Sequence, residues 1–147
     1  MRVCFDSRPA AARSGIGRYV RCLLDALLMV AAERGGNVVE GRNPRADVDL
    51  FHSPWMGGAL LRPRVPMVVT VHDLVHHKRA GESLRAGLRG SMRTLAIARA
   101  ARLICPTFAV ADDAASVLRF DRERIDVIAE APADRFRPRA ADRKSVV

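Results

Sequence analysis

The chain is poor in aromatic residues and cysteine, and it has no long apolar run. Aromatic side chains make up 5% of its 147 residues, and no basic cluster is interleaved with them. This argues against single-stranded nucleic-acid binding, which depends on base stacking.

Asp25 interrupts the longest apolar stretch, so no segment spans a bilayer, and the first residues lack the apolar core of a signal peptide. The three cysteines, Cys4, Cys22 and Cys105, are odd in number and sit in apolar surroundings, which predicts reduced core thiols and a cytoplasmic protein.

The chain also has little lysine, although it is strongly basic. Only Lys78 and Lys144 are lysines among 25 basic residues, so 23 are arginines, and the net charge is +9. Such a skew often reflects a GC-rich coding sequence. The functional alternatives are an anionic lipid surface, nucleic acid or phosphorylated substrates. With 49% hydrophobic and 28% charged residues, the composition is that of one soluble globular domain.

Strand and helix patterns alternate along the chain. Strands are expected at residues 2–6, 38–39, 48–52, 65–71, 102–106 and 126–128, and helices at 15–34, 83–101 and 109–119. Alternation of this kind implies parallel βαβ units. The expected fold is therefore α/β: a Rossmann-like, doubly wound, mainly parallel sheet with helices on both faces.

Helical periodicity predicts which side of each long helix is buried, and two residues are expected to cap helices. Ser83 is expected to cap the 83–101 helix and Thr107 the 109–119 helix. The apolar stripe of the first helix is Ile16, Tyr19, Val20, Leu23, Leu24, Leu27, Leu28 and Ala31. That of the second long helix is Leu84, Leu88, Met92, Leu95 and Ala96.

Two ionisable residues, His72 and Asp73, follow the most apolar strand at its carboxyl end. Ligands bind at that edge of an open α/β sheet, and an imidazole there can donate, accept or relay a proton near neutral pH. His52 and Ser53 also end a strand and are expected to line the same cleft. The alternatives are an N-cap Asp beside a structural His, and for Ser53 an ordinary strand stop.

Gly15 and Gly17 open the first helix after a strand. Glycines let a ligand approach the backbone, and free N–H groups with the helix dipole attract phosphate or carboxylate. A flexible helix start is the simpler alternative. A dinucleotide fingerprint, with Glu40 binding a ribose, is disfavoured because about eight residues separate the strand from the glycines and Val20 occupies the third glycine position.

Two further clusters have structural alternatives. His72, Asp73, His76 and His77 could indicate a metal, but no second ligand cluster accompanies them, so no metal site is expected. A basic ridge recurs every fourth residue at Arg85, Arg89 and Arg93. A solvated helix face is the favoured interpretation, and peripheral docking to an anionic inner-membrane surface is the sharper hypothesis.

Taken together, five blocks resemble the amino-terminal domain of family 4 glycosyltransferases, which have the GT-B fold. In chain order they are "MRVCFDSRP…SGIGRYVRCLLDAL", "DVDLFHSP", "VPMVVTVHDL", "ARAARLICPTFAVADDAASVL" and "RIDVIAEAPADRFRP". The resemblance implies that His72 lies at the reaction centre and that Asp73 orients it. It implies donor-phosphate or substrate contacts for Gly15, Ile16, Gly17, Arg18, His52, Ser53 and Thr107, the last standing where the family usually has serine.

In that family two Rossmann-like domains face each other, one for the acceptor and one for a nucleotide sugar. The resemblance implies that residues 1–136 are the acceptor-side domain and that 137–147 are a linker or truncated tail, with the donor domain absent. It implies sugar transfer with retention to a glycan or lipid acceptor, without a metal or a cofactor besides the nucleotide-sugar donor. Such a fragment is expected to be inactive unless a donor domain or partner chain completes it. The alternatives are a non-catalytic binding module or gene remnant, and a nicotinamide-dependent oxidoreductase.

Overall fold

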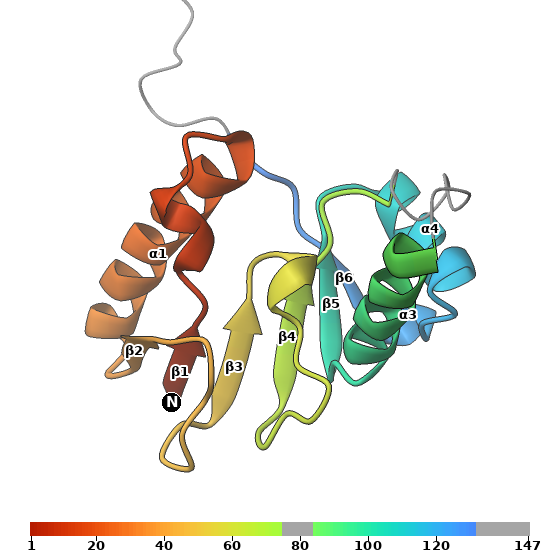
Figure 1. Ribbon diagram of the computed structural model, residues 1–147. Coiled ribbons are helices and arrows are strands. Elements are labelled where there is room, and N and C mark those ends of the chain that lie inside the picture. Colours follow the sequence, from red (N-terminus) through yellow and green to blue (C-terminus); the bar gives the residue numbers. More distant parts are fainter. Residues whose placement is uncertain (75–83, 132–147) are drawn as a thin grey trace, which may run out of the picture.

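A computed structural model of the chain describes residues 1–74 and 84–131. These residues form a six-stranded, entirely parallel sheet with helices packed against it (Figure 1). The strands are β1 (Arg2–Phe5), β2 (Asn37–Glu40), β3 (Leu50–Ser53), β4 (Met67–Thr70), β5 (Arg102–Cys105) and β6 (Ile125–Val127). The longer helices are α1 (Gly15–Glu33), α3 (Leu84–Ala98) and α4 (Phe108–Val117). Short 3-10 helices are η1 (Arg8–Ala11), η2 (Met56–Gly58) and η3 (Arg122–Arg124).

The strand order, β2-β1-β3-β4-β5-β6, is that of a doubly wound sheet. From β1 the chain passes through α1 to β2 on one side, and it then crosses to β3 on the other side of β1. The order therefore reverses between β1 and β3, and the carboxyl ends of these two strands flank the crevice where ligands bind in such sheets. The predicted α/β Rossmann-like architecture is confirmed.

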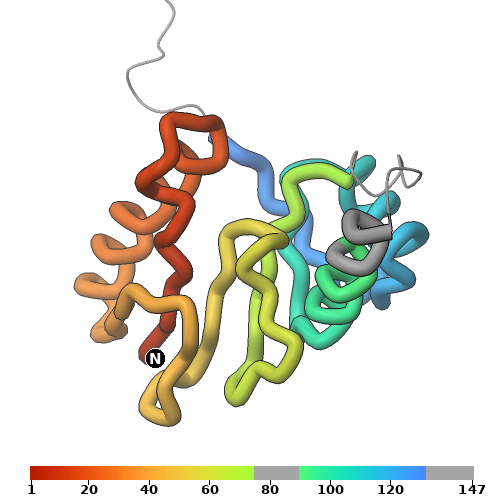
Figure 2. The backbone as a smooth tube through the Cα atoms, viewed as in Figure 1, coloured from red at the N-terminus to blue at the C-terminus, as the bar shows by residue number. Residues whose placement is uncertain are grey.

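The register of the strands assigns the two faces of the sheet. Cys4, Phe51 and Met67 lie at paired positions of neighbouring strands and belong to a buried cluster with residues of α3 and α4, such as Ile97 and Ala111. The alternate residues point to the opposite face. There Phe5 contacts the ring of His52, and Tyr19 of α1 is hydrogen-bonded to Thr70. Helices thus cover both faces, with α1 on one side and α3 and α4 on the other (Figures 1 and 2).

Local signals in the sequence explain where the helices begin and end. Ser14 caps α1 by accepting a hydrogen bond from the Gly17 amide at 3.3 Å, and Thr107 caps α4 by accepting one from the Val110 amide at 3.2 Å. Beyond the end of α1, Gly35 takes a positive φ of 65°, which glycine adopts without strain. The predicted cap Ser83, the predicted tail 137–147 and the pair His76 and His77 lie outside the described residues.

The predicted buried faces of the helices are partly wrong. In α1 only Gly17 and Val20 are buried, and Leu28 is 46% exposed. The main contacts of this helix are with η1, beside its start, and with the edge strand β2. In α3 the described buried residues are Ala96 and Ile97, whereas Met92 and Leu95 are 49% and 52% exposed. Helical periodicity identifies an apolar side, but the width of the sheet decides how much of that side is covered.

The predicted core thiols are also partly wrong. Cys4 and Cys105 are buried, but Cys22 lies on the exposed side of α1. All three are free thiols.

Candidate functional site

His72 lies just beyond the carboxyl end of β4 and is held by three different segments. Its Nδ1 atom is 2.7 Å from Oε1 of Glu130, which follows β6, and its Nε2 atom is 3.0 Å from the carbonyl oxygen of Pro54, which follows β3. The ring of Tyr19, from the first turns of α1, meets the imidazole edge to face with 4.6 Å between centroids. The side chain remains 22% exposed, so a ligand can still reach it. The rim of the sheet and the start of α1 therefore meet at His72.

The two glycines at the start of α1 differ in their surroundings. A Cβ atom on Gly17 would lie 2.1 Å from the carbonyl oxygen of Ala12 and 2.7 Å from that of Pro9, so glycine is required there for packing against η1. A Cβ on Gly15 would meet nothing within 4 Å. Since the Gly17 amide is already bonded to Ser14, the first amides of the helix, at Gly15 and Ile16, are the ones placed to meet an anion.

A buried carboxylate occupies the point where the strand order reverses. Asp6, the residue after β1, is fully buried and accepts two side-chain hydrogen bonds from Arg8, both 2.8 Å long, and one from Trp55 Nε1 at 2.8 Å. Burial raises the pKa of this carboxyl, but the hydrogen bonds from Arg8 and Trp55 outweigh burial and leave the pKa below its usual value. Gly58 packs so closely here that a Cβ would lie 2.1 Å from Asp6 Oδ2. This arrangement fixes the guanidinium of Arg8, half of whose side chain is exposed, at the edge of the crevice.

His52 lies in the interior and not on the exposed rim. It is 7% exposed, its Nε2 atom is 3.1 Å from Thr70 Oγ1, and Thr70 in turn is hydrogen-bonded to Tyr19. Burial lowers the pKa of His52 to about 4, so the ring is neutral at pH 7. Burial also raises the pKa of Tyr19, and the nearby charge of Glu130 adds to this effect. These contacts form a polar network beneath His72, and they assign His52 a structural position.

The other predicted site residues are divided between the turn after β3 and the exposed rim. Ser53 is fully buried and donates a hydrogen bond to the carbonyl oxygen of Trp55 at 2.7 Å, which closes the turn after β3. Thr107 follows β5 and is exposed, although its hydroxyl oxygen accepts the capping hydrogen bond from the Val110 amide. Asp73 is exposed at the rim next to His72, and Arg18 is half-buried in the first turn of α1. Within residues 1–74 and 84–131, no group of three or more His, Cys, Asp or Glu is placed to hold a metal ion.

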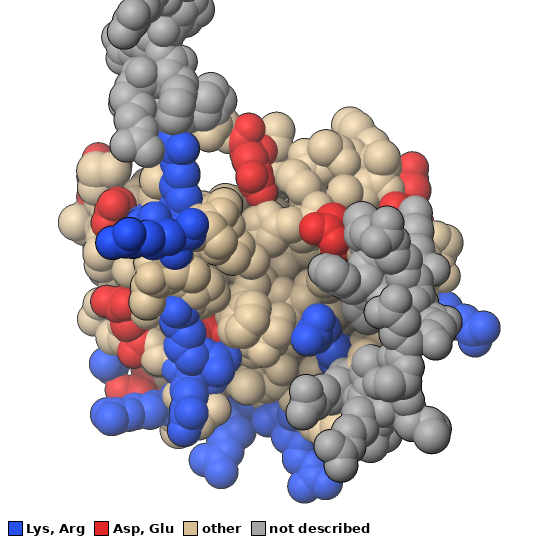
Figure 3. All heavy atoms as spheres, turned by 45° about the horizontal axis from the view of Figure 1, so that its top comes forward, with Lys and Arg blue, Asp and Glu red and all other residues tan. Residues whose placement is uncertain are grey.

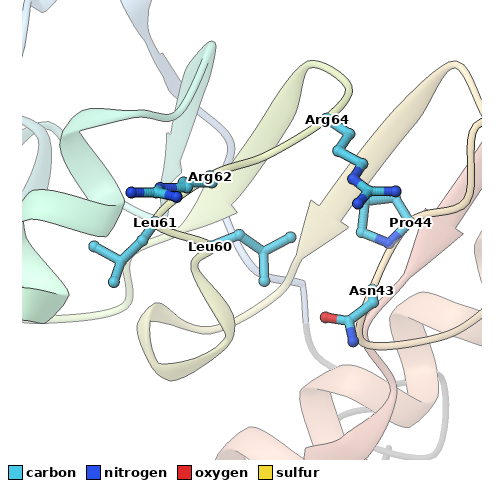
Figure 4. Close-up of a pocket in the computed structure, with 6 residues that line it drawn as sticks. All are labelled: Asn43, Pro44, Leu60, Leu61, Arg62 and Arg64. Carbon is cyan, nitrogen blue, oxygen red and sulfur yellow. The ribbon is translucent and has the colours of Figure 1, made fainter.

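Two open pockets lie between the segment that follows β2 and the one that follows η2. The first, about 430 Å³, is lined by Asn43, Pro44, Leu60, Leu61, Arg62 and Arg64 (Figure 4). The second, about 290 Å³, adjoins the crevice, since Arg8, Arg42 and Gly58 are among its lining residues. In the view that brings the carboxyl edge forward, basic and acidic atoms both lie on the side of α1, and basic atoms predominate at the bottom (Figure 3). Arg8 and Arg42 give the second pocket basic side chains beside the crevice.

The fold and the rim define a Rossmann-like α/β domain in which side chains from several segments gather at the carboxyl edge of the sheet. The sequence model of Glycosyltransferase Family 4 matches residues 40–130, more than half of the chain. The chain belongs to this family. The match begins at the end of β2 and so does not include the glycines of α1. A comparison with curated protein sequences finds no match.

Sequence reasoning missed several residues that build this site. Glu130 and Tyr19 contact His72, and Arg8, Trp55 and Asp6 form the cluster at the reversal of the strand order. Asp6 could have been identified from the sequence, because it is a carboxylate directly after a buried strand, where ligands bind in such sheets. Glu130 and Trp55 could not be identified in this way, because their partners, His72 and Asp6, are 58 and 49 residues away in the sequence.

Proposed function

We propose that this chain is the acceptor-binding half of a retaining glycosyltransferase, which moves a sugar from a nucleotide-sugar donor to a glycan or lipid acceptor. The observation that carries the proposal is the meeting of His72, on the rim beyond β4, with Tyr19, one turn after Gly15. Family membership supports the reaction class. The pocket beside Arg8 and Arg42 offers room for part of an acceptor next to the crevice.

The chemistry that the proposal requires fits the groups on the rim. Transfer needs a stabilised leaving diphosphate and a positioned acceptor hydroxyl. The amides of Gly15 and Ile16 and the dipole of α1 would attract phosphate oxygens, with Arg18 nearby. His72 would hydrogen-bond to a substrate oxygen, Asp73 would help to orient it, and Thr107 would line the same rim. The proposal needs a donor-binding domain, in the same polypeptide or in a separate chain, and it invokes no metal or cofactor besides the donor.

Activity of the chain joined to, or mixed with, a donor-binding domain tests this proposal. His72→Ala is expected to abolish sugar transfer while the thermal unfolding midpoint stays near that of the parent. Glu40→Gln, at the exposed end of β2, is the matched control and is expected to retain activity. Unchanged turnover in His72→Ala would refute the role assigned to the imidazole. The anomeric configuration of the product, read by NMR, tests retention.

Peripheral attachment to an anionic membrane, from a cytoplasmic location, is a second part of the proposal. Its support is on α3, where Met92 and Leu95 are about half exposed and Arg93 lies beside them on the exposed surface. Apolar side chains next to basic ones are typical of helices that bind the membrane surface. Within the described part of the chain, no helix is long and apolar enough to cross a bilayer.

Flotation with liposomes tests the membrane proposal. The chain is expected to float with vesicles that contain anionic lipid and to remain in solution with neutral vesicles. The double variant Met92→Ser, Leu95→Ser should float less. Equal recovery with both kinds of vesicle would contradict the proposal.

A non-catalytic binding module is the alternative function. Its support is the interior position of His52 and the turn-closing position of Ser53, which leave fewer predicted site residues on the rim. Absence of transfer with every donor domain supplied, together with retained ligand binding, would favour it.

A further inference from the structure

Both ring nitrogens of His72 face hydrogen-bond acceptors. Nδ1 is 2.7 Å from a carboxylate oxygen of Glu130, and Nε2 is 3.0 Å from the carbonyl oxygen of Pro54. Neither an ionised carboxylate nor a carbonyl oxygen can donate a proton. A neutral imidazole has a single N–H. One of its two nitrogens would then face an oxygen atom with no hydrogen between them. Only the doubly protonated ring donates to both.

The two acceptors differ in their freedom to move. Pro54 is fully buried, and its carbonyl oxygen belongs to the backbone of the turn after β3. The carboxyl side chain of Glu130 is 44% exposed. The other groups near the ring are Tyr19 of α1, whose edge contact carries no charge, and Asp73, the next residue in the chain. Glu130 is a charged partner of His72 at hydrogen-bond distance, and its charge strengthens the bond.

We propose that Glu130 is a positioning residue that stabilises the doubly protonated form of His72 and fixes the orientation of its ring. A ligand oxygen that reaches the rim replaces the exposed Glu130 carboxylate at Nδ1, because the Pro54 carbonyl is buried. His72 therefore acts on its ligand as a hydrogen-bond donor and not as a base. The identity of that ligand, a sugar or phosphate oxygen, rests on the proposed function, but the charge of the ring does not.

Nitrogen-15 NMR of the imidazole rings in the labelled 147-residue chain tests the proposal. The nitrogen-15 shifts of the ring distinguish its doubly protonated form from its singly protonated form, and the ratio of the two forms is compared between variants at one fixed pH. Glu130→Gln keeps the shape of the side chain but removes its charge, and it should lower this ratio for His72 several-fold. Glu130→Asp should restore part of it. Glu40→Gln is the matched control, because Glu40 ends a strand at the far edge of the sheet.

An equal ratio in the parent chain and in Glu130→Gln would overturn the proposal. If Glu130→Gln does not fold, Glu130→Asp provides the test, because it keeps the charge but shortens the reach of the carboxylate to Nδ1. Its His72 ratio should lie below that of the parent chain, and an unchanged ratio would count against Glu130. If His72→Ala loses transfer while Glu130→Gln leaves the charge of the His72 ring unchanged, this inference is refuted and the proposed function is not. A ring charge that depends on Glu130 in a chain that never transfers sugar would refute only the proposed function.

Discussion

The ring of Tyr19 packs edge to face against that of His72, with their centroids 4.6 Å apart. This contact joins the start of α1 to the rim beyond β4, although three strands, β2, β3 and β4, lie between Tyr19 and His72 in the sequence. Tyr19 also reaches down to Thr70, and Thr70 to the buried His52. The mostly buried imidazole of His72 therefore packs on a residue that belongs to a connected polar network.

Substitution by alanine is expected to change the free energy of unfolding strongly at Gly17 and only slightly at Gly15. Gly17→Ala would place a Cβ 2.1 Å from the Ala12 carbonyl oxygen, so it should lower the free energy of unfolding by about 1–3 kcal/mol, the usual cost of overpacking. Gly15→Ala meets nothing within 4 Å and should change it by less than about 1 kcal/mol. Urea unfolding of both variants measures the difference. Equal destabilisation of the two would contradict the close packing of Gly17 on η1.

The bonds around Asp6 predict a second stability effect. Arg8→Ala leaves a fully buried carboxylate with fewer donors and should cost about 1–3 kcal/mol, whereas Trp55→Phe removes one neutral donor and should cost about 1 kcal/mol. The pKa of Asp6 is lowered by folding, so its contribution is present above its unfolded value of 3.8 and is lost as the pH falls through the lower folded value. Urea unfolding at pH 7 and below pH 4 checks both points. A cost of Arg8→Ala that persists unchanged at low pH would argue against the ion pair as its source.

The elements of the fold could be predicted because their signals are local. The strand at β4 is apolar and β-branched, Thr107 is an N-cap residue, and Gly35 ends a helix. The helices expected at 15–34 and 109–119 are confirmed as α1 and α4, with small shifts at their ends. Burial of α1 beyond its first turns could not be predicted, because it depends on what the opposite surface offers to Leu28.

The site could be predicted only where it follows the carboxyl ends of strands. That rule places His72, Asp73 and Thr107 on the rim, as the structure does. The same rule failed to separate His52 from them, because it gives the end of a strand but not the direction of the side chain. Pairing of His72 with Glu130 depends on the order of β4, β5 and β6 in the sheet, which no local pattern in the sequence specifies.

The difference in burial among the three cysteines predicts that one of them reacts rapidly with thiol reagents. Cys22 is exposed on α1, whereas Cys4 and Cys105 are buried, and burial raises the pKa of Cys105 to about 11. Since the thiolate is the reactive form, a thiol reagent at about pH 8 should modify one cysteine rapidly and the other two only on denaturation. Cys22→Ser should remove the fast phase. A fast phase that survives this substitution would place a second thiol at the surface.

The buried imidazole of His52 predicts a loss of stability in mild acid. Burial lowers its folded pKa to about 4, against 6.5 in the unfolded chain, so the unfolded state binds the proton first as the pH falls. The free energy of unfolding should therefore decrease by up to about 3 kcal/mol between these two values. This window lies above the one in which Asp6 titrates, so the two effects separate. His52→Gln keeps a polar partner for Thr70 but cannot titrate. Urea unfolding at pH 7 and at about pH 4.5 should show a smaller decrease for this variant than for the parent, because the remaining three histidines are common to both chains. An equal decrease in the two chains would mean that His52 is accessible to protons in the folded state.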